Sequence, residues 1–145
     1  MTRLIFVNLP VADLDRSKAF YEALGFTNEP RFTDETAACM VLSDTIFVMI
    51  LTHDKWKSFT TRPIPSKDSS EVMLAISCDS KDEVNRFADT AGKQGGIADV
   101  NPVQDHGFMF SRSFTDLDGH IWETMWMDPA VAEGDAHVSE AEASA

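Results

Sequence analysis

The sequence predicts an α+β fold in which the order strand, helix, strand, strand, strand occurs twice. The chain has 145 residues, 43% of them hydrophobic and 25% charged, a balance typical of a globular domain. Two segments offset by 67 residues share the same succession of strand, helix cap, apolar stripe and glycine. Two long helical stretches accompany about eight strands, which argues against a doubly wound parallel sheet.

The first half begins with a strand at residues 4–11, because apolar and mixed positions alternate along it. Asp13 follows as the expected N-cap of a helix, and Gly25 as the glycine that ends it. Short strands bounded by turn residues are predicted at 27–33, 37–42 and 46–52.

The second half repeats this order. Residues 72–78 alternate as a strand, Ser80 and Glu83 form a capping box, an apolar stripe at helical spacing follows, and Gly92 matches Gly25 at the 67-residue offset. Further strands are predicted at 97–103, 107–115 and 120–126. Between the halves, the segment HDKWKSF favours a short helix, followed by a linker rich in proline and serine.

These patterns predict one domain over residues 1–127, with module one at 3–53, a linker at 54–70 and module two at 71–127. Residues 128–145 contain five acidic and no basic residues and lack apolar periodicity, so we expect a flexible tail. Cys39 and Cys78 lie in apolar strand-like runs, which favours buried free thiols over a disulfide.

The composition also excludes classes of partner. The net charge is −12, and the 12 Lys and Arg residues are scattered, so we expect no nucleic-acid partner. The longest apolar runs are far shorter than the roughly 20 residues that a membrane span needs. The first residues lack the pattern of a secretory signal, and a cytoplasmic protein is expected.

Two segments carry a resemblance to a known superfamily. VADLDRSKAFYEALGF (residues 11–26) and SFTDLDGHIWETMW (residues 113–126) resemble the opening and closing segments of the vicinal oxygen chelate superfamily. It includes glyoxalase I, bleomycin and fosfomycin resistance proteins and extradiol dioxygenases, and the chain is most similar to its bacterial glyoxalase-like group. The resemblance implies two βαβββ modules forming a half-open, barrel-like cleft around a small-molecule ligand, and a homodimer.

The resemblance also implies where a divalent metal would bind. Metal-dependent members use a His or Gln early in each module and a Glu in each closing strand. Those positions fall on Phe6, on Met73, on Val48 or Met49, and on Glu123. One carboxylate does not hold a catalytic metal, so no cofactor is expected, although a weakly held divalent metal stays open.

The strand alternation nominates residues that face the ligand. If the aliphatic faces pack under the helices, the opposite faces present the side chains of Phe6, Asn8, Met73, Ala75, Glu123 and Met125. Glu123 would then be an acid among apolar neighbours and is the candidate catalytic residue, as a general acid or base. The alternative is that Glu123 pairs with Arg112 or makes a local hydrogen bond.

Phe110 and Arg112 are the remaining candidates for ligand binding. Both lie in the segment FMFSRSF and share one strand face. An arginine among aromatic side chains suits a ligand carboxylate or phosphate, and an ion pair inside the fold is the alternative.

Three hypotheses for the function follow. The first is a protein that binds a small molecule, apolar or anionic, without the usual complete metal site. The second is a lyase or isomerase of the same superfamily that uses Glu123 with a weakly held divalent metal. The third is a structural or interaction module whose cleft is filled.

Overall fold

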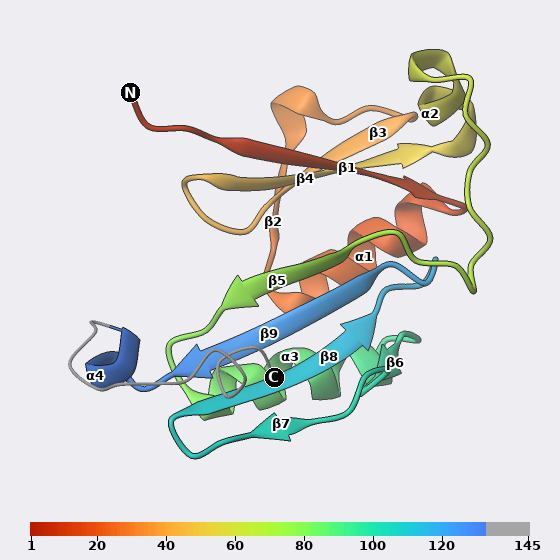
Figure 1. Ribbon diagram of the computed structural model, residues 1–145. Helices are drawn as coiled ribbons and strands as arrows, with labels where there is room; N and C mark the ends of the chain where they lie inside the picture. Colours follow the sequence, from red (N-terminus) through yellow and green to blue (C-terminus); the bar gives the residue numbers. More distant parts are fainter. Residues whose placement is uncertain (133–145) are drawn as a thin grey trace. The chain divides into compact units, whose positions relative to one another are not determined.

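The computed structural model describes residues 1–132 and has two sheets with helices, which confirms the predicted α+β fold class (Figure 1). The chain forms two compact units. The first unit comprises Met1–Ser70 together with the turn Asp116–His120. The second unit comprises Glu71–Thr115 and the residues from Ile121 onward.

The first unit contains a four-stranded sheet in the order β1-β4-β3-β2, with β1 parallel to β4. Its elements are β1 (Ile5–Val11), α1 (Leu14–Leu24), β2 (Thr27–Glu29), η1 (Pro30–Phe32), β3 (Ala37–Val41), β4 (Ile46–Thr52) and α2 (His53–Phe59). The predicted cap is confirmed, because the Asp13 side chain accepts a hydrogen bond from the Arg16 backbone N–H at 3.1 Å. Gly25 ends α1 with φ 108°, a left-handed conformation that favours glycine.

The strand predicted at residues 27–33 is wrong in its second part. β2 ends at Glu29, and Pro30–Phe32 forms a single 3₁₀ turn instead. Pro30 lacks a backbone N–H and has a fixed φ, so it suits the first position of a helical turn and interrupts a ladder. The short helix predicted from HDKWKSF is confirmed as α2, which Thr52 caps through the Lys55 N–H.

The second unit contains a sheet in the order β5-β9-β8-β6, with the short β7 also paired to β8. Its elements are β5 (Met73–Ser77), α3 (Lys81–Lys93), β6 (Ile97–Ala98), β7 (Gln104–Asp105), β8 (Met109–Thr115), β9 (Ile121–Met127) and α4 (Pro129–Ala132). The Ser80 hydroxyl accepts the Glu83 N–H at 3.1 Å, which confirms the predicted cap of α3. Buried Phe87 of α3 stacks on Phe114, so the helix covers the sheet face that contains Phe114 and Trp122.

The strand predicted at residues 97–103 is wrong after Ala98, and the next short strand, β7, begins only at Gln104. β6 stops at Ala98 because Asp99 has a φ of 55°, in the left-handed region that non-glycine residues seldom adopt. Pro102 lies before β7, and a proline cannot donate to a ladder. The chain between the two short strands is therefore a loop rather than one continuous strand.

The turn Asp116–His120 is organised by buried polar contacts. Asp116 accepts hydrogen bonds from the Tyr21 hydroxyl at 2.7 Å and from the backbone N–H groups of Asp118 and His120. Burial raises the pKa of the Asp116 carboxyl above its usual value. Asp118 in turn accepts the Ala12 N–H at 2.8 Å, at the start of α1.

Gly119 is required at its position in this turn. Its φ is 85°, and a Cβ there would lie 2.3 Å from the Lys67 carbonyl oxygen. The His120 ring Nε2 lies 2.7 Å from the Pro10 carbonyl oxygen and donates to it. The D-x-D-G pattern therefore fixes a tight turn against β1, α1 and the linker of the first unit.

Three further expectations concern the cysteines, the membrane and the tail. Cys39 and Cys78 are buried free thiols, as predicted; burial raises the pKa of both, that of Cys78 to about 12. Among the helices of residues 1–132, none has the length and apolar character that crossing a membrane requires. The predicted acidic tail begins with the short helix α4, and its residues 133–145 lie outside the described residues.

Candidate ligand-binding site

Glu123 lies on the middle strand of the second sheet. β9 pairs with β5 on one side and with β8 on the other, so Glu123 is flanked by Ala75 and Ser113. The neighbouring pairs of the parallel ladder are Met73 with Ile121 and Ser77 with Met125. The predicted residues Met73, Ala75, Glu123 and Met125 therefore share one face of this sheet.

The other face of the same strands is covered by α3. Trp122 and Thr124 alternate with Glu123 along β9 and are buried, with exposed fractions of 1% and 0%. Glu123 itself is half-buried, and Met73 and Ala75 are exposed within the described residues. The face with Glu123 is therefore the open face of the second sheet.

The loop between β6 and β7 brings a polar partner to Glu123. Asn101 Nδ2 donates to Glu123 Oε1 at 3.0 Å, and it lies 3.4 Å from the Met73 sulfur. The Asn101 backbone N–H donates to the Ser113 hydroxyl at 2.8 Å. These contacts fix the loop over the open face of the sheet.

A pocket of about 290 Å³ lies where this loop meets the sheet. Its polar side chains come from Asn101, Gln104, Ser111, Ser113 and Glu123, and its apolar side chains come from Met73 and Pro102. The volume is at the lower end of the range for small-molecule sites, which is about 300–1,000 Å³. The pocket lies wholly within the second unit.

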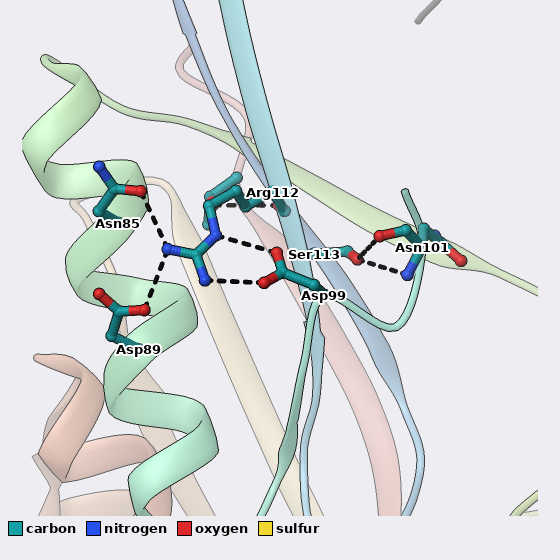
Figure 2. Close-up of polar contacts among 7 residues, drawn as sticks. Asn85, Asp89, Asp99, Asn101, Arg112 and Ser113 are labelled. Atoms are coloured by element: carbon teal, nitrogen blue, oxygen red, sulfur yellow. Dashed lines mark hydrogen bonds and ion pairs between the residues drawn. The ribbon is translucent and has the colours of Figure 1, made fainter. Parts of the chain in front are cut away.

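Arg112 also borders the pocket, but its guanidinium lies on the α3 side of the sheet (Figure 2). Arg112 pairs with Thr124 across the β8–β9 ladder, next to the pair of Ser113 with Glu123. Because side chains alternate along a strand, Arg112 and Glu123 lie on opposite faces of the sheet. Arg112 Nε and Nη2 donate to the two oxygens of Asp99 at 2.9 and 2.8 Å, and the hydrogen bond raises the pKa of Arg112. Its Nη1 contacts Asn85 and Asp89 of α3 at 2.9 and 3.0 Å.

These contacts bear on the alternatives for Arg112 and Glu123. The guanidinium of Arg112 is bound by carboxylates of its own unit, which supports the ion pair inside the fold over a ligand-binding role. Phe110 pairs with Trp126 and shares the α3 side with Arg112. Glu123 makes the local hydrogen bond, to Asn101.

The equivalent surface of the first unit is mostly apolar, with Asn8 as its polar residue. Phe6 and Asn8 lie on one face of β1, opposite Phe47 and Met49 of β4, and the rings of Phe6 and Phe47 stack at 4.7 Å. Asn8 pairs with Met49 as Ala75 pairs with Glu123. Met49, rather than Val48, is therefore the counterpart of Glu123 in the first unit.

The donors at the implied metal positions do not fit a divalent metal. They are the phenyl ring of Phe6, the thioethers of Met49 and Met73, and the carboxylate of Glu123. A hard or borderline divalent cation needs several oxygen or imidazole ligands, and an aromatic ring and thioethers do not supply them. Within residues 1–132, three or more His, Cys, Asp or Glu side chains do not come together as a metal-binding group.

Sequence reasoning missed the polar residues that complete the pocket, which are Asn101, Gln104, Ser111 and Ser113. Two signals for them were present. Ser111 and Ser113 alternate with Phe110 and Arg112, which places the serines on the face opposite the aromatic residues. The Asn101-Pro102 dipeptide is typical of a turn rather than of a strand.

Comparison with known proteins agrees with this architecture. A family model described as bleomycin resistance protein-like N-terminal matches residues 3–43. No curated protein matches the sequence.

Solved structures match over most of the chain. Hypothetical protein SA1046 from S. aureus has a TM-score of 0.71 and 23% identity, with 87% of this chain and 95% of that one covered. A glyoxalase/bleomycin resistance protein/dioxygenase family enzyme from Burkholderia phytofirmans PsJN has a TM-score of 0.73 and 14% identity, covering 87% and 99%. The fosfomycin resistance protein FosX from Mesorhizobium loti has a TM-score of 0.65 and 20% identity, covering 94% and 99%.

The fold of this chain is thus the fold of glyoxalase/bleomycin resistance/dioxygenase proteins, as the resemblance implied, and the matching family model includes the segment at residues 11–26.

Proposed function

We propose that this protein binds a small organic molecule in the second-unit pocket, through Glu123 and Asn101 and without the complete metal site of metal-dependent superfamily members. The observation that supports the proposal is a half-buried carboxylate in a pocket of about 290 Å³, with one oxygen held 3.0 Å from Asn101 Nδ2. A carboxylate fixed in this way, beside Gln104 and two serine hydroxyls, offers an oriented set of hydrogen-bonding groups.

The donor chemistry supports the absence of a complete metal site. Three of the four implied ligand positions contain Phe6, Met49 and Met73, whose side chains are apolar or weakly coordinating. Binding therefore depends on direct contacts between the ligand and the side chains of the pocket.

A library of small molecules, screened by ligand-observed NMR against the full chain, tests the proposal. Ser111→Phe fills the pocket from β8, and Ser43→Phe places the same side chain in an exposed turn of the first unit as the control. We expect compounds that bind the wild type and Ser43→Phe but not Ser111→Phe. Binding that is unchanged in folded Ser111→Phe contradicts the proposal.

A lyase or isomerase activity is the second candidate function. It is favoured by one observation, that Glu123 is the acidic residue among those bordering the pocket. A carboxylate placed next to a bound ligand can remove and return a proton beside a carbonyl group. The test is turnover of a ligand found in the screen: Glu123→Gln should abolish conversion while the ligand still binds.

A further inference from the structure

The Lys and Arg residues of the second unit all have their charged groups away from the pocket face. Between residues 71–115 and 121–132, they are Lys81, Arg86, Lys93 and Arg112. The first three belong to α3, which packs on the sheet face opposite Glu123. Arg112 reaches from β8 to the same helix.

The charge of Arg112 is also balanced by the unit itself. Asp99 binds it through two hydrogen bonds and Asp89 through a third contact, and the Arg112 side chain is only 13% exposed. Figure 2 shows the guanidinium between Asp99 and the α3 residues Asn85 and Asp89, with Asn101 on the far side of Asp99 from α3. A ligand anion in the pocket would therefore find no Lys or Arg charge of this unit, among its described residues, to compensate the loss of its hydration.

Two charged residues border the pocket, and Glu123 is the one whose charged group lies on the pocket face, because the Arg112 guanidinium is bound to Asp99, Asn85 and Asp89. Asn101 donates to Glu123 Oε1, which orients the carboxylate and leaves its remaining lone pairs to accept further hydrogen bonds. The other polar groups of the pocket, from Gln104, Ser111 and Ser113, are neutral and can accept as well as donate. Met73 and Pro102 supply the apolar wall.

We infer that the ligand of this pocket is a small molecule with a protonated amine, whose ammonium group binds Glu123 and whose apolar part packs against Met73 and Pro102. This inference rests on the proposed function and names the ligand class of the same pocket. A charge-assisted hydrogen bond from an ammonium to a carboxylate is about twice as strong as a neutral one. The volume of about 290 Å³ limits the ligand to a compact molecule.

Three probes of nearly equal size and different charge test the inference: benzylamine, benzyl alcohol and benzoate. Each is titrated into the ¹⁵N-labelled full chain at pH 7, and the backbone amide shifts of Asn101, Gln104 and Ser111 report on the pocket. We expect benzylamine to bind at least about tenfold more tightly than benzoate, with benzyl alcohol between them. Raising the salt concentration should reduce this preference.

Two variants assign the preference to its residue. Glu123→Gln keeps the shape of the side chain and removes its charge, so it should lower the benzylamine affinity about tenfold and leave that of benzyl alcohol nearly unchanged. Glu71→Gln removes an exposed acid just before β5, in the same unit, and should leave the order of the three probes unchanged.

The outcomes separate this inference from the proposed function. Equal binding of the three probes, or tightest binding of benzoate, overturns the amine class while the pocket still binds small molecules. A preference for benzylamine that persists in Glu123→Gln also overturns it, because the selecting charge then lies elsewhere. Absence of pocket shifts with all three probes contradicts both proposals.

Discussion

The hairpins β3–β4 and β8–β9 have the same backbone hydrogen bond across their turns, but their side chains differ in polarity. The first residue of each turn donates its N–H to the fifth residue's carbonyl, Leu42 to Ile46 and Asp116 to His120, both at 3.0 Å. Three residues further along, Met49 pairs with Cys39, and Glu123 pairs with Ser113. The first hairpin is thus apolar at the two positions where the second has carboxylates.

This comparison distinguishes how firmly the backbone holds a position from which chemical group the side chain offers there. β4 and β9 are both inner strands, flanked on both sides by other strands, so side chains at Met49 and Glu123 are held equally well by the ladders. In the first unit that rigid position carries a thioether, and in the second it carries an acid with an amide partner. An equivalent backbone therefore borders a polar pocket only where the polar residues and the β6–β7 loop are present.

The largest expected effect is at the two turns. Asp116→Ala removes the acceptor for the Tyr21 hydroxyl and for two backbone N–H groups, so we expect a loss of about 3 kcal/mol in the free energy of unfolding. Leu42→Ala, at the matching position of the other hairpin, should lose about 1 kcal/mol, because Leu42 is only half-buried. Urea denaturation measures both, and equal losses would contradict a special role for Asp116.

The next effect compares two arginines. Arg112→Ala should lower the free energy of unfolding by about 1–2 kcal/mol, a figure that discounts the Asp89 contact because that side chain is 57% exposed. Arg31→Ala is the control in the first unit, where the arginine pairs with Glu29 and is 79% exposed, and it should change stability by less than about 0.5 kcal/mol.

The loop gives Arg112→Ala a second readout. The Asp99 side chain binds Arg112, and the Asp99 backbone N–H donates a hydrogen bond to the Ser113 carbonyl at 2.7 Å. Because Asp99 belongs to the β6–β7 loop, removing the arginine should speed amide hydrogen exchange of residues 99–104. Unchanged exchange there would show that Arg112 does not hold the loop.

A histidine scan sharpens the comparison of the two strand faces. Met73 Sδ lies 3.4 Å from Asn101 Nδ2, which lies 3.0 Å from Glu123, so Met73→His places an imidazole near a carboxylate. Calorimetry should show about tenfold tighter Zn²⁺ binding than the wild type. Phe6→His faces Phe47 and Met49 instead and should show no gain, and equal gains would contradict the difference between the two faces.

The smallest effect is a pH dependence at Asp116. Burial raises its folded-state pKa above the model-compound value of 3.8. The protonated carboxyl therefore contributes stability that is fully present below about pH 3.8 and is lost as the pH rises through the folded-state pKa. The stability of the wild type relative to Asp116→Asn should accordingly decline from pH 4 upward.

Denaturation at several pH values measures this decline. Asp44→Asn, in the exposed turn of β3–β4, is the control and should show no such decline relative to the wild type. A rising difference between wild type and Asp116→Asn would mean that the ionised form is the one that the fold stabilises.

Local signals were sufficient to predict most of the fold. Asp13 and Ser80 cap the helices where the sequence placed them, because an N-cap acts within a few residues of the chain. The face of Glu123 followed from the alternation of side chains along a strand. The 67-residue offset indicated the repeated order of elements, and the resemblance supplied the expectation that the two modules form a cleft, which propensity alone does not determine.

The missed features depend on contacts between distant residues. Arg112 contacts Asn85 and Asp89, which are 27 and 23 positions earlier in the chain, and no local sequence pattern predicts these contacts. The path of the β6–β7 loop turns on Asp99 adopting φ 55°, which the contacts to Arg112 and Ser113 impose. Asn101 reaches Glu123 only because of that turn, so the sequence could nominate the acid but not its partner.

The turn Asp116–His120 determines which parts of the coding sequence are needed to encode the first unit. Its five residues belong to the first unit, while the strands on either side of them belong to the second. A coding sequence cut after Ser70 would still encode β1–β4, yet it would omit the carboxylates that accept from Tyr21 and Ala12. The N-terminal half therefore does not encode its whole unit, and we expect recombination that exchanges this half to preserve the turn together with it.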